Sequence, residues 1–300
     1  MTRTQFYRIV EIRTKIISMT TFLCGSVYAL YDTGLWSWTT FIMMGFAVLF
    51  VDMGTTGFNS YYDYISGTDN QTYNLERDKV LVHENVPPNT ALAISLTLFA
   101  LAGILGLVLA SRTSWWLIVA GGACMVVGYT YTGGPFPISR TPFGEVFAGG
   151  FLGTVLFTLS YFVLTKTVNI GAVAASIPLT LLIAKILSVN NTCDRIADEI
   201  AGRKTMVILL GADKAKFLLM GELAASYAWA FLLIFLNILP WHTGPLLVIA
   251  AVFSVKRFQA MLRRGFSLET KGPSMNDVSQ LFLASGASLC IGCLVAFIIR

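Results

Sequence analysis

Nine apolar segments are distributed along the 300 residues of the chain. They are Ile16–Tyr31, Trp38–Phe58, Thr90–Ala110, Trp115–Thr132, Val146–Leu164, Ile170–Val189, Phe217–Leu239, Leu246–Phe258 and Val278–Ile299. A membrane-spanning helix needs about 20 mostly apolar residues, and most of these segments approach that length. Charged residues make up 12% of the chain, whereas an average globular domain has about 25%. The sequence therefore predicts an all-α polytopic membrane protein and excludes a soluble enzyme.

Lysine and arginine are distributed unevenly between the two sides that these spans define. Most of the 21 Lys and Arg residues fall in the N-terminus and in alternate loops after it, and cytoplasmic loops are the ones enriched in these residues. We therefore expect an integral protein of a bacterial plasma membrane, with a cytoplasmic N-terminus and an extracytoplasmic C-terminus. This topology accounts for the net charge of +5. The expected partner is the lipid bilayer, and no motif indicates nucleic acid.

Two polar clusters follow the second and the sixth apolar segments, both on the predicted cytoplasmic side. The first contains Asn59, Asp63 and Asp69, and the second contains Asn191, Asp194 and Asp198. Polar groups at the ends of membrane spans are costly and usually mark a functional path. Asp194 and Asp198 share one face of a helix, where two carboxylates repel each other unless a cation lies between them. We interpret each cluster as half of a divalent-metal site.

The ligand types in these clusters indicate which metal would bind. All six residues offer oxygen atoms, which favour Mg²⁺ or Ca²⁺ over zinc. Mg²⁺ usually binds through a few carboxylates together with the phosphates of a substrate. Basic residues that can contact phosphate follow each cluster, namely Arg77 and Lys79 after the first and Arg203 and Lys204 after the second. The pattern predicts a metal-bridged diphosphate with its apolar tail in the bilayer, and ordinary solvated loops are the alternative.

The two clusters and a loop between them resemble a known family. Asn59-x-x-x-Asp63 with Asp69, and Asn191-x-x-Asp194-x-x-x-Asp198, are similar to the two Asp-rich motifs of the UbiA superfamily of intramembrane prenyltransferases. The segment from Tyr129 to Glu145 and the segment Gly202-Arg-Lys-Thr205 resemble the 1,4-dihydroxy-2-naphthoate polyprenyltransferase branch, which serves the menaquinone pathway. The resemblance extends over roughly residues 15 to 299.

This resemblance implies a fold, a cofactor and a reaction. The fold would be nine transmembrane helices around a central cavity that opens to the cytoplasmic side, formed by residues 16–300 after a cytoplasmic segment at residues 1–15. With Mg²⁺ as the cofactor, the enzyme would transfer a polyprenyl group from an isoprenyl diphosphate to 1,4-dihydroxy-2-naphthoate. Diphosphate and CO₂ would leave, and the product would be a demethylmenaquinone-type quinone.

The resemblance also distributes roles among the candidate residues. Asp63, Asp194 and Asp198 would be catalytic, and together with Asp69, Asn59 and Asn191 they would bind the metal. Substrate would be bound by the two asparagines and by Arg77, Lys79, Arg203, Lys204, Tyr129, Tyr131, Arg140, Glu145 and Lys185.

Three of these substrate residues have competing interpretations. Some family members carry Tyr-x-x-x-Lys after the fourth span, but Gly133 stands four residues after Tyr129 here, and Arg140 is the cation that we expect to replace the lysine. Glu145 either orients the aromatic substrate or compensates the dipole of its helix. Lys185 lies within a span, where a charge must be paired or must face a cavity.

Two other functions remain open at this point. The same chemistry can act on another aromatic acceptor, such as 4-hydroxybenzoate. The chain can also be a cation-coupled carrier, but a carrier places ionisable groups near the middle of the bilayer, whereas these clusters lie at the ends of spans.

Ser60 stands where many family members have an aspartate, directly after the asparagine of the first motif.

Overall fold

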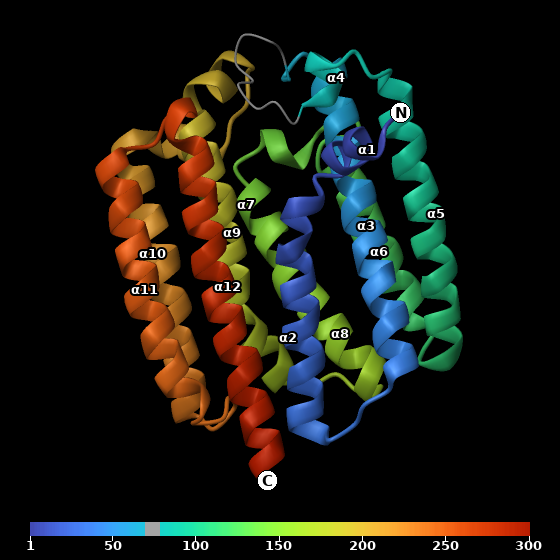
Figure 1. The fold of residues 1–300 in the computed structure, drawn as a ribbon, viewed down its shortest axis with the longest axis vertical. Helices are drawn as coiled ribbons and strands as arrows, with labels where there is room; N and C mark the ends of the chain where they lie inside the picture. Colours follow the sequence, from blue (N-terminus) through green and yellow to red (C-terminus); the bar gives the residue numbers. More distant parts are fainter. Residues whose placement is uncertain (70–78) are drawn as a thin grey trace. The chain divides into compact units, whose positions relative to one another are not determined.

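The computed structural model describes residues 1–69 and 79–300 and contains only helices and connecting turns over these ranges (Figure 1). The prediction of an all-α protein is therefore confirmed. The chain forms two compact units, each built from segments that are not consecutive in sequence. Unit 1 comprises Met1–Ile16, Ile42–Thr141 and Ile196–Lys204, and unit 2 comprises Ile17–Phe41, Pro142–Arg195 and Thr205–Arg300.

Unit 1 contains the N-terminal helices and the first acidic cluster. Its elements are α1 (Arg3–Ile9), the 3₁₀ helix η1 (Ile12–Lys15), most of α3 (Trp38–Ile65), α4 (Val80–His83), α5 (Pro88–Arg112), α6 (Trp116–Thr130), the 3₁₀ helix η2 (Ile138–Arg140) and the last turn of α9. α5 packs against α6, and α1 packs against α4 (Figure 1).

The N-terminal residues, which the sequence places before the transmembrane domain, pack into unit 1. Ile9 and Val10 are buried in one apolar cluster with Val80 and Leu81 of α4. The Lys15 ammonium is buried, and it lies 2.7 Å from the Asp52 carboxylate on α3. A buried charge persists when a partner compensates it, so this ion pair fixes the end of the N-terminal segment on α3.

Unit 2 contains the remaining helices. Its elements are α2 (Ile16–Thr33), α7 (Gly144–Gly149), the π-helix η3 (Gly150–Val155), α8 (Leu156–Thr165), α9 (Ile170–Ile200, as far as residue 195), α10 (Met206–Phe235), α11 (Thr243–Arg264) and α12 (Leu268–Ile299). α7, η3 and α8 form one continuous helix. α11 packs against both α10 and α12 (Figure 1).

A close helix approach within unit 2 depends on a glycine in the π segment. A Cβ atom added to Gly153 would lie 2.6 Å from the Cα atom of Thr180 on α9. Real Cβ atoms essentially never come so near to another backbone. Glycine is therefore required here because it lets the π segment touch α9.

Seven helices among the described residues are long and apolar enough to cross a membrane. They are α3, α5, the continuous helix Gly144–Thr165, α9, α10, α11 and α12. The first and fourth expected spans correspond to α2, with 18 residues, and α6, with 15; α6 is shorter than the about 20 residues that a bilayer requires. A total of nine spans, and the side on which a cavity opens, stay predictions.

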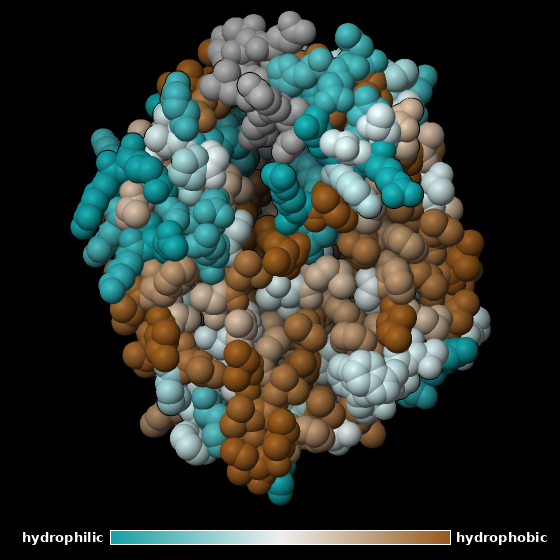
Figure 2. All heavy atoms as spheres, in the orientation of Figure 1, coloured by the Kyte–Doolittle hydropathy of each residue, from teal (hydrophilic) through white to brown (hydrophobic). Residues whose placement is uncertain are grey.

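Apolar side chains cover the outside of several of these helices. Leu96, Leu101, Ile104 and Leu107 of α5 are exposed, and so are Ile298 and Ile299 at the end of α12. Figure 2 shows these apolar surfaces on α5 and around the C-terminus. Exposed apolar patches of this extent are rare on soluble monomers. A lipid environment accounts for them, in agreement with the composition.

Candidate functional site

The first acidic motif lies on a helix rather than in a loop. α3 continues to Ile65, which is about two turns beyond the expected end of the span at Phe58. Asn59 and Asp63 are therefore one turn apart on one helix face. The Thr132 hydroxyl donates a hydrogen bond to Oδ1 of Asn59. This contact fixes the orientation of the Asn59 amide.

Arg203 joins the first acidic motif to the last residue of the second one. Its Nη2 lies 3.1 Å from Oδ1 of Asp63, and its Nη1 lies 3.2 Å from Oδ1 of Asp198. Gly202 adopts a φ of 74° just after α9, a left-handed conformation that glycine adopts without strain and that ends many helices. The Arg203 amide then donates to the Asp198 carbonyl at 2.9 Å. This turn brings the guanidinium back over Asp198.

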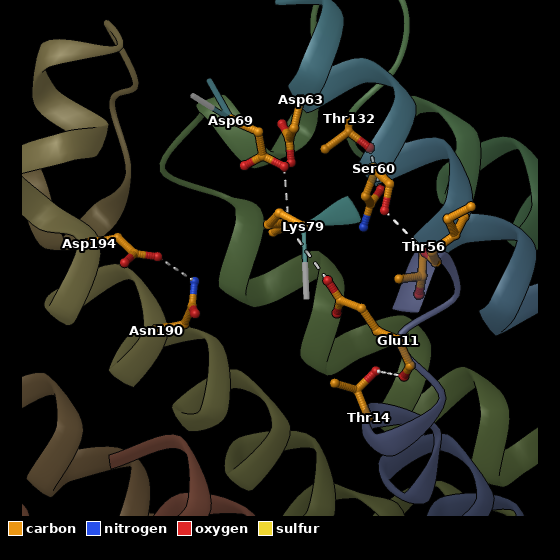
Figure 3. Close-up of polar contacts among 12 residues, drawn as sticks. Glu11, Thr14, Thr56, Ser60, Asp63, Asp69, Lys79, Thr132, Asn190 and Asp194 are labelled. Atoms are coloured by element: carbon orange, nitrogen blue, oxygen red, sulfur yellow. Dashed lines mark hydrogen bonds and ion pairs between the residues drawn. The ribbon is translucent and has the colours of Figure 1, made fainter. Parts of the chain in front are cut away.

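Asp69 follows α3 and contacts a different cation. Its backbone amide donates to the Asp63 carbonyl at 2.9 Å, so the chain turns tightly after the helix. The Asp69 carboxylate lies 3.3 Å from Nζ of Lys79, which also lies 3.5 Å from Glu11 (Figure 3). Arg77, another predicted phosphate contact, lies outside the described residues.

The loop after α6 lies in the same unit as the first motif. Nη2 of Arg140 donates to the Thr68 hydroxyl at 2.9 Å, between Asp63 and Asp69 in sequence. The carbonyl of Arg140 accepts the Lys204 amide at 2.9 Å. The hydroxyl groups of Tyr129 and Tyr62 are 2.9 Å apart. Unit 1 therefore gathers the side chains of Lys79, Arg140 and Arg203 near the first motif.

Tyr131 contributes to the same loop through its backbone. Its carbonyl accepts a hydrogen bond from the Ser139 amide at 2.8 Å, which closes the loop ahead of η2. This hydrogen bond is made by the backbone of Tyr131 and holds the loop that carries Arg140.

The second acidic motif lies on the extended end of α9. α9 continues to Ile200, beyond the expected end of the span at Val189, so Asp194 precedes Asp198 by one helical turn. Within unit 2, Oδ2 of Asp194 accepts a hydrogen bond from Asn190 at 3.2 Å (Figure 3). It lies 2.8 Å from Nζ of Lys271.

Lys271 is a site residue that the sequence analysis did not select. Ser267 and Thr270 form a capping box that starts α12, and this places Lys271 in the first turn of that helix. The only sequence signal was its position in a basic loop on the predicted cytoplasmic side. Its acidic partner is 77 residues away in the chain, a separation that no local pattern reveals.

Glu145 and Asn191 meet in the interior of unit 2. Nδ2 of Asn191 donates to Oε1 of Glu145 at 2.8 Å, which ties α7 to α9. The Glu145 side chain is buried, and its Oε2 has no hydrogen-bond partner among the described residues. A buried carboxylate oxygen without a partner is costly. Glu145 therefore presents an acceptor that a bound hydroxyl group can satisfy.

Lys185 is paired with protein groups in unit 2. It is fully buried, donates to the Leu219 carbonyl of α10, and lies 3.8 Å from the centre of the Phe258 ring. The sequence analysis missed a half-buried carboxylate in the same unit, Glu222, which accepts a hydrogen bond from Ser188 at 2.8 Å. The Leu219 carbonyl and the Phe258 ring compensate the charge of Lys185 without a ligand, as in the pairing interpretation given above.

The donor atoms of the two motifs fit Mg²⁺ in chemistry. They are carboxylate and amide oxygens, which hard divalent cations prefer. In this conformation the carboxylates instead contact Arg203, Lys79 and Lys271. Accordingly, residues 1–69 and 79–300 contain no group of three or more His, Cys, Asp or Glu side chains that could hold a metal ion. The right ligands are present, and the chain's own cations neutralise them.

The helices, the two acidic motifs and their basic partners agree with comparisons to known proteins. Residues 18–269 match the UbiA prenyltransferase family. The chain belongs to this family.

The most informative relatives are enzymes of known name. A 1,4-dihydroxy-2-naphthoate octaprenyltransferase from Bacillus subtilis is 32% identical over 280 residues, which is 92% of this chain and 87% of the relative. One from Mycobacterium tuberculosis is 29% identical over 204 residues, 68% of each chain. A structure of a UbiA homolog from Archaeoglobus fulgidus bound to DMAPP and Mg²⁺ has a TM-score of 0.61 at 16% identity, covering 95% of this chain and 99% of that chain. The last comparison shows the shared fold.

Proposed function

We propose that this protein transfers a prenyl group from an isoprenyl diphosphate to 1,4-dihydroxy-2-naphthoate. The observation that carries this proposal is the 32% identity to the Bacillus subtilis octaprenyltransferase over 92% of the chain. Similarity over nearly the whole length includes both acidic motifs and the loop after α6. A naphthoate prenyltransferase is therefore favoured over an enzyme for another aromatic acceptor and over a carrier.

The diphosphate end of the substrate binds at the two acidic motifs. Arg203, Lys204 and Lys79 contact the phosphate oxygens, because charge-assisted hydrogen bonds to phosphate are strong and an arginine can make two at once. These cations stabilise the negative charge that grows on diphosphate as the allylic C–O bond breaks. Stabilisation of developing charge by preorganised groups is the largest catalytic effect in many enzymes.

Asp63, Asp69, Asp194 and Asp198, with the amide oxygens of Asn59 and Asn191, are the residues that would hold Mg²⁺. When bound, Mg²⁺ supplies Lewis-acid stabilisation of the leaving diphosphate. The family relationship and the Mg²⁺ in the Archaeoglobus fulgidus structure support this assignment. Asp63 and Asp198 already share one cation, Arg203, which supports their joint role.

The aromatic acceptor is oriented by Glu145. Its Oε1 is held by Asn191, and its buried Oε2 is available to a hydroxyl group of the acceptor. Tyr129 at the end of α6 contacts the substrate, and so do Tyr131 and Arg140 in the loop after that helix. The allylic cation is captured at the ring carbon that carries the carboxylate, so CO₂ leaves and the aromatic system is restored. An apolar surrounding protects the cation from water.

The reaction takes place in a bacterial plasma membrane. Residues 16–300 form one nine-helix domain, with α2 and α6 completing the seven longer spans, and residues 1–15 precede it on the cytoplasmic side. The concentration of Lys and Arg in the N-terminus and in alternate loops supports this orientation. An isoprenyl tail would remain within the bilayer while the diphosphate lies at the cytoplasmic ends of α3 and α9.

A direct assay tests this function. The purified protein in detergent would be given Mg²⁺, a labelled prenyl diphosphate, and either carboxyl-labelled 1,4-dihydroxy-2-naphthoate or 4-hydroxybenzoate. We expect a prenylated naphthoquinol and labelled CO₂ from the first acceptor only. Turnover of 4-hydroxybenzoate alone would overturn the acceptor, and no turnover with either would overturn the proposed enzyme. Omission of Mg²⁺ should abolish product formation.

A further inference from the structure

Each of the four aspartates in the two acidic motifs contacts a basic side chain of the same chain. Within unit 1, Arg203 contacts both Asp63 and Asp198, and Lys79 contacts Asp69. Within unit 2, Lys271 contacts Asp194. The basic partners come from three separate places: the turn after α9, the start of α4 and the start of α12. The pairing is therefore a property of the tertiary fold and not of one local motif.

The Arg203 cluster has little contact with water. The side chains of Asp63, Asp198 and Arg203 are only 17%, 7% and 13% exposed. Two carboxylates in such a place need a cation between them, and removal of one partner from a buried ion pair is strongly destabilising. A divalent cation that arrived alone would have to displace Arg203 from both carboxylates.

A diphosphate group changes this balance. Its oxygens accept bidentate hydrogen bonds from a guanidinium. They can therefore bind Arg203 when the metal binds the carboxylates that Arg203 has left. The backbone amide of Arg203 is bonded to the Asp198 carbonyl, and this anchors the residue beside the site while its long side chain changes partner. This chemistry allows a guanidinium and a metal ion to alternate on the same two carboxylates.

We propose that Arg203 is an exchangeable counter-ion that makes the binding of the divalent metal and of diphosphate mutually dependent. It holds Asp63 and Asp198 when no metal is bound, and it moves to the diphosphate when the metal–diphosphate complex enters. Lys271 is the corresponding exchangeable counter-ion of Asp194. This inference rests on the proposed function, because it takes an isoprenyl diphosphate as the substrate. It adds that the metal alone binds weakly because Arg203 and Lys271 already pair with the carboxylates that would hold it.

The test compares two affinities that the exchange moves in opposite directions. Electron paramagnetic resonance would measure the binding of Mn²⁺ alone to the full-length protein in detergent, and retention of ³²P-pyrophosphate at saturating Mn²⁺ would measure binding of the anion. In Arg203→Gln, we expect Mn²⁺ alone to bind about tenfold more tightly than in the wild type and pyrophosphate about tenfold more weakly, changes typical of coupling between two ligands. Lys271→Gln should shift both affinities in the same directions.

Other outcomes would overturn the exchange. Weaker pyrophosphate binding with unchanged Mn²⁺ affinity would make Arg203 a simple diphosphate ligand. Weaker binding of both would make it a structural support. Arg203→Lys keeps a charge and should lie between the wild type and Arg203→Gln; if Arg203→Gln does not fold, Arg203→Lys must still show both shifts.

A matched control and an independent assay complete the experiment. Lys216→Gln removes a cation whose partner, Asp213, is 92% exposed, and it should change neither affinity. The prenyl-transfer assay described above is scored separately. Opposite shifts in the two affinities without any transfer would overturn the proposed function and keep the exchange, whereas transfer without opposite shifts would overturn the exchange alone.

Discussion

Asp63 on α3 and Asp198 on α9 contact the two terminal nitrogens of one guanidinium, that of Arg203, at 3.1 and 3.2 Å. One aspartate comes from each acidic motif, so a single side chain connects the two motifs within unit 1. The arrangement depends on the glycine turn that ends α9 and on the extension of α3 beyond its apolar part. The turn places Arg203 over Asp198, and the extension places Asp63 on a helix.

The first prediction concerns the aspartates themselves. Asp63→Asn and Asp198→Asn should each lower prenyl transfer by about 10²-fold or more, the typical cost of losing one group that stabilises charge in a transition state. An amide has almost the same shape but lacks the negative charge that balances a cation. The rates of product formation would be compared with the helix content measured by circular dichroism.

The control for these variants is Asp213→Asn. Asp213 is an exposed aspartate that pairs with Lys216 on α10, and its loss should leave the rate unchanged. If Asp63→Asn and Asp198→Asn retained full rates while keeping their helix content, the assignment of both carboxylates to the site would be wrong.

The second prediction distinguishes the binding of the aromatic acceptor from the binding of the prenyl diphosphate. Glu145→Gln should lower kcat/KM for the naphthoate by about tenfold to a hundredfold, because hydrogen bonds to charged groups contribute about 1.5–3 kcal/mol. The KM for the prenyl diphosphate should not change. Steady-state kinetics with each substrate varied in turn measures both values.

An equal loss for both substrates in Glu145→Gln would contradict this assignment, since it would indicate general damage to the fold. Glu145→Asp keeps the charge on a shorter side chain. We expect it to lie between the wild type and Glu145→Gln in its kcat/KM for the naphthoate.

The third prediction tests the contact between the π segment and α9. Gly153→Ala should reduce stability by about 1–3 kcal/mol, the usual cost of overpacking, because the new Cβ would lie 2.6 Å from the Cα atom of Thr180. Gly150→Ala, in the same π segment, adds a Cβ that has no atom within 4 Å among the described residues apart from its own chain neighbours and helix backbone. Thermal unfolding in detergent should show a lower midpoint for Gly153→Ala only.

The fourth prediction concerns the buried Lys185 and the half-buried Glu222 of unit 2. Lys185→Met should reduce stability by about 1–3 kcal/mol, the usual cost of leaving a buried polar group without its partner, because the Leu219 carbonyl loses its hydrogen bond from the buried ammonium. Adding Glu222→Gln to this variant tests whether the two charges stabilise each other. Unfolding of the wild type, the two single variants and the double variant measures the coupling.

Kinetic data on the same variants distinguish the two interpretations of Lys185. A structural pair leaves the KM of both substrates unchanged. A raised KM for one substrate in Lys185→Met, without loss of stability, would restore the substrate role that the sequence suggested.

Much of the helical architecture was predictable because apolar segments of this length have few alternatives. The ends of the helices were less predictable. α3 and α9 continue through polar residues, since Asn59, Asp63, Asp194 and Asp198 face protein partners that replace water. Local composition indicates a loop there, and only tertiary contacts favour continued helix.

The sequence predicted the acidic residues of the candidate site, but only some of the basic residues that pair with them. The spacing of Asp194 and Asp198 follows the helical period, so the sequence alone places them on one face. The pairing of Asp194 with Lys271, and of Asp63 with Arg203, joins residues 77 and 140 positions apart. Such pairs depend on how distant helices pack, and a single sequence carries no signal for them.

The π segment Gly150–Val155 has a consequence for Glu145, which precedes it on the same continuous helix. A π turn holds one residue more than an α turn would and is found mostly at functional sites. Deleting that residue would rotate everything before it by about 100° relative to α8. The Glu145 side chain would then point in a different direction and lose its hydrogen bond from Asn191. The extra residue of the π turn therefore determines the direction in which the Glu145 carboxylate points.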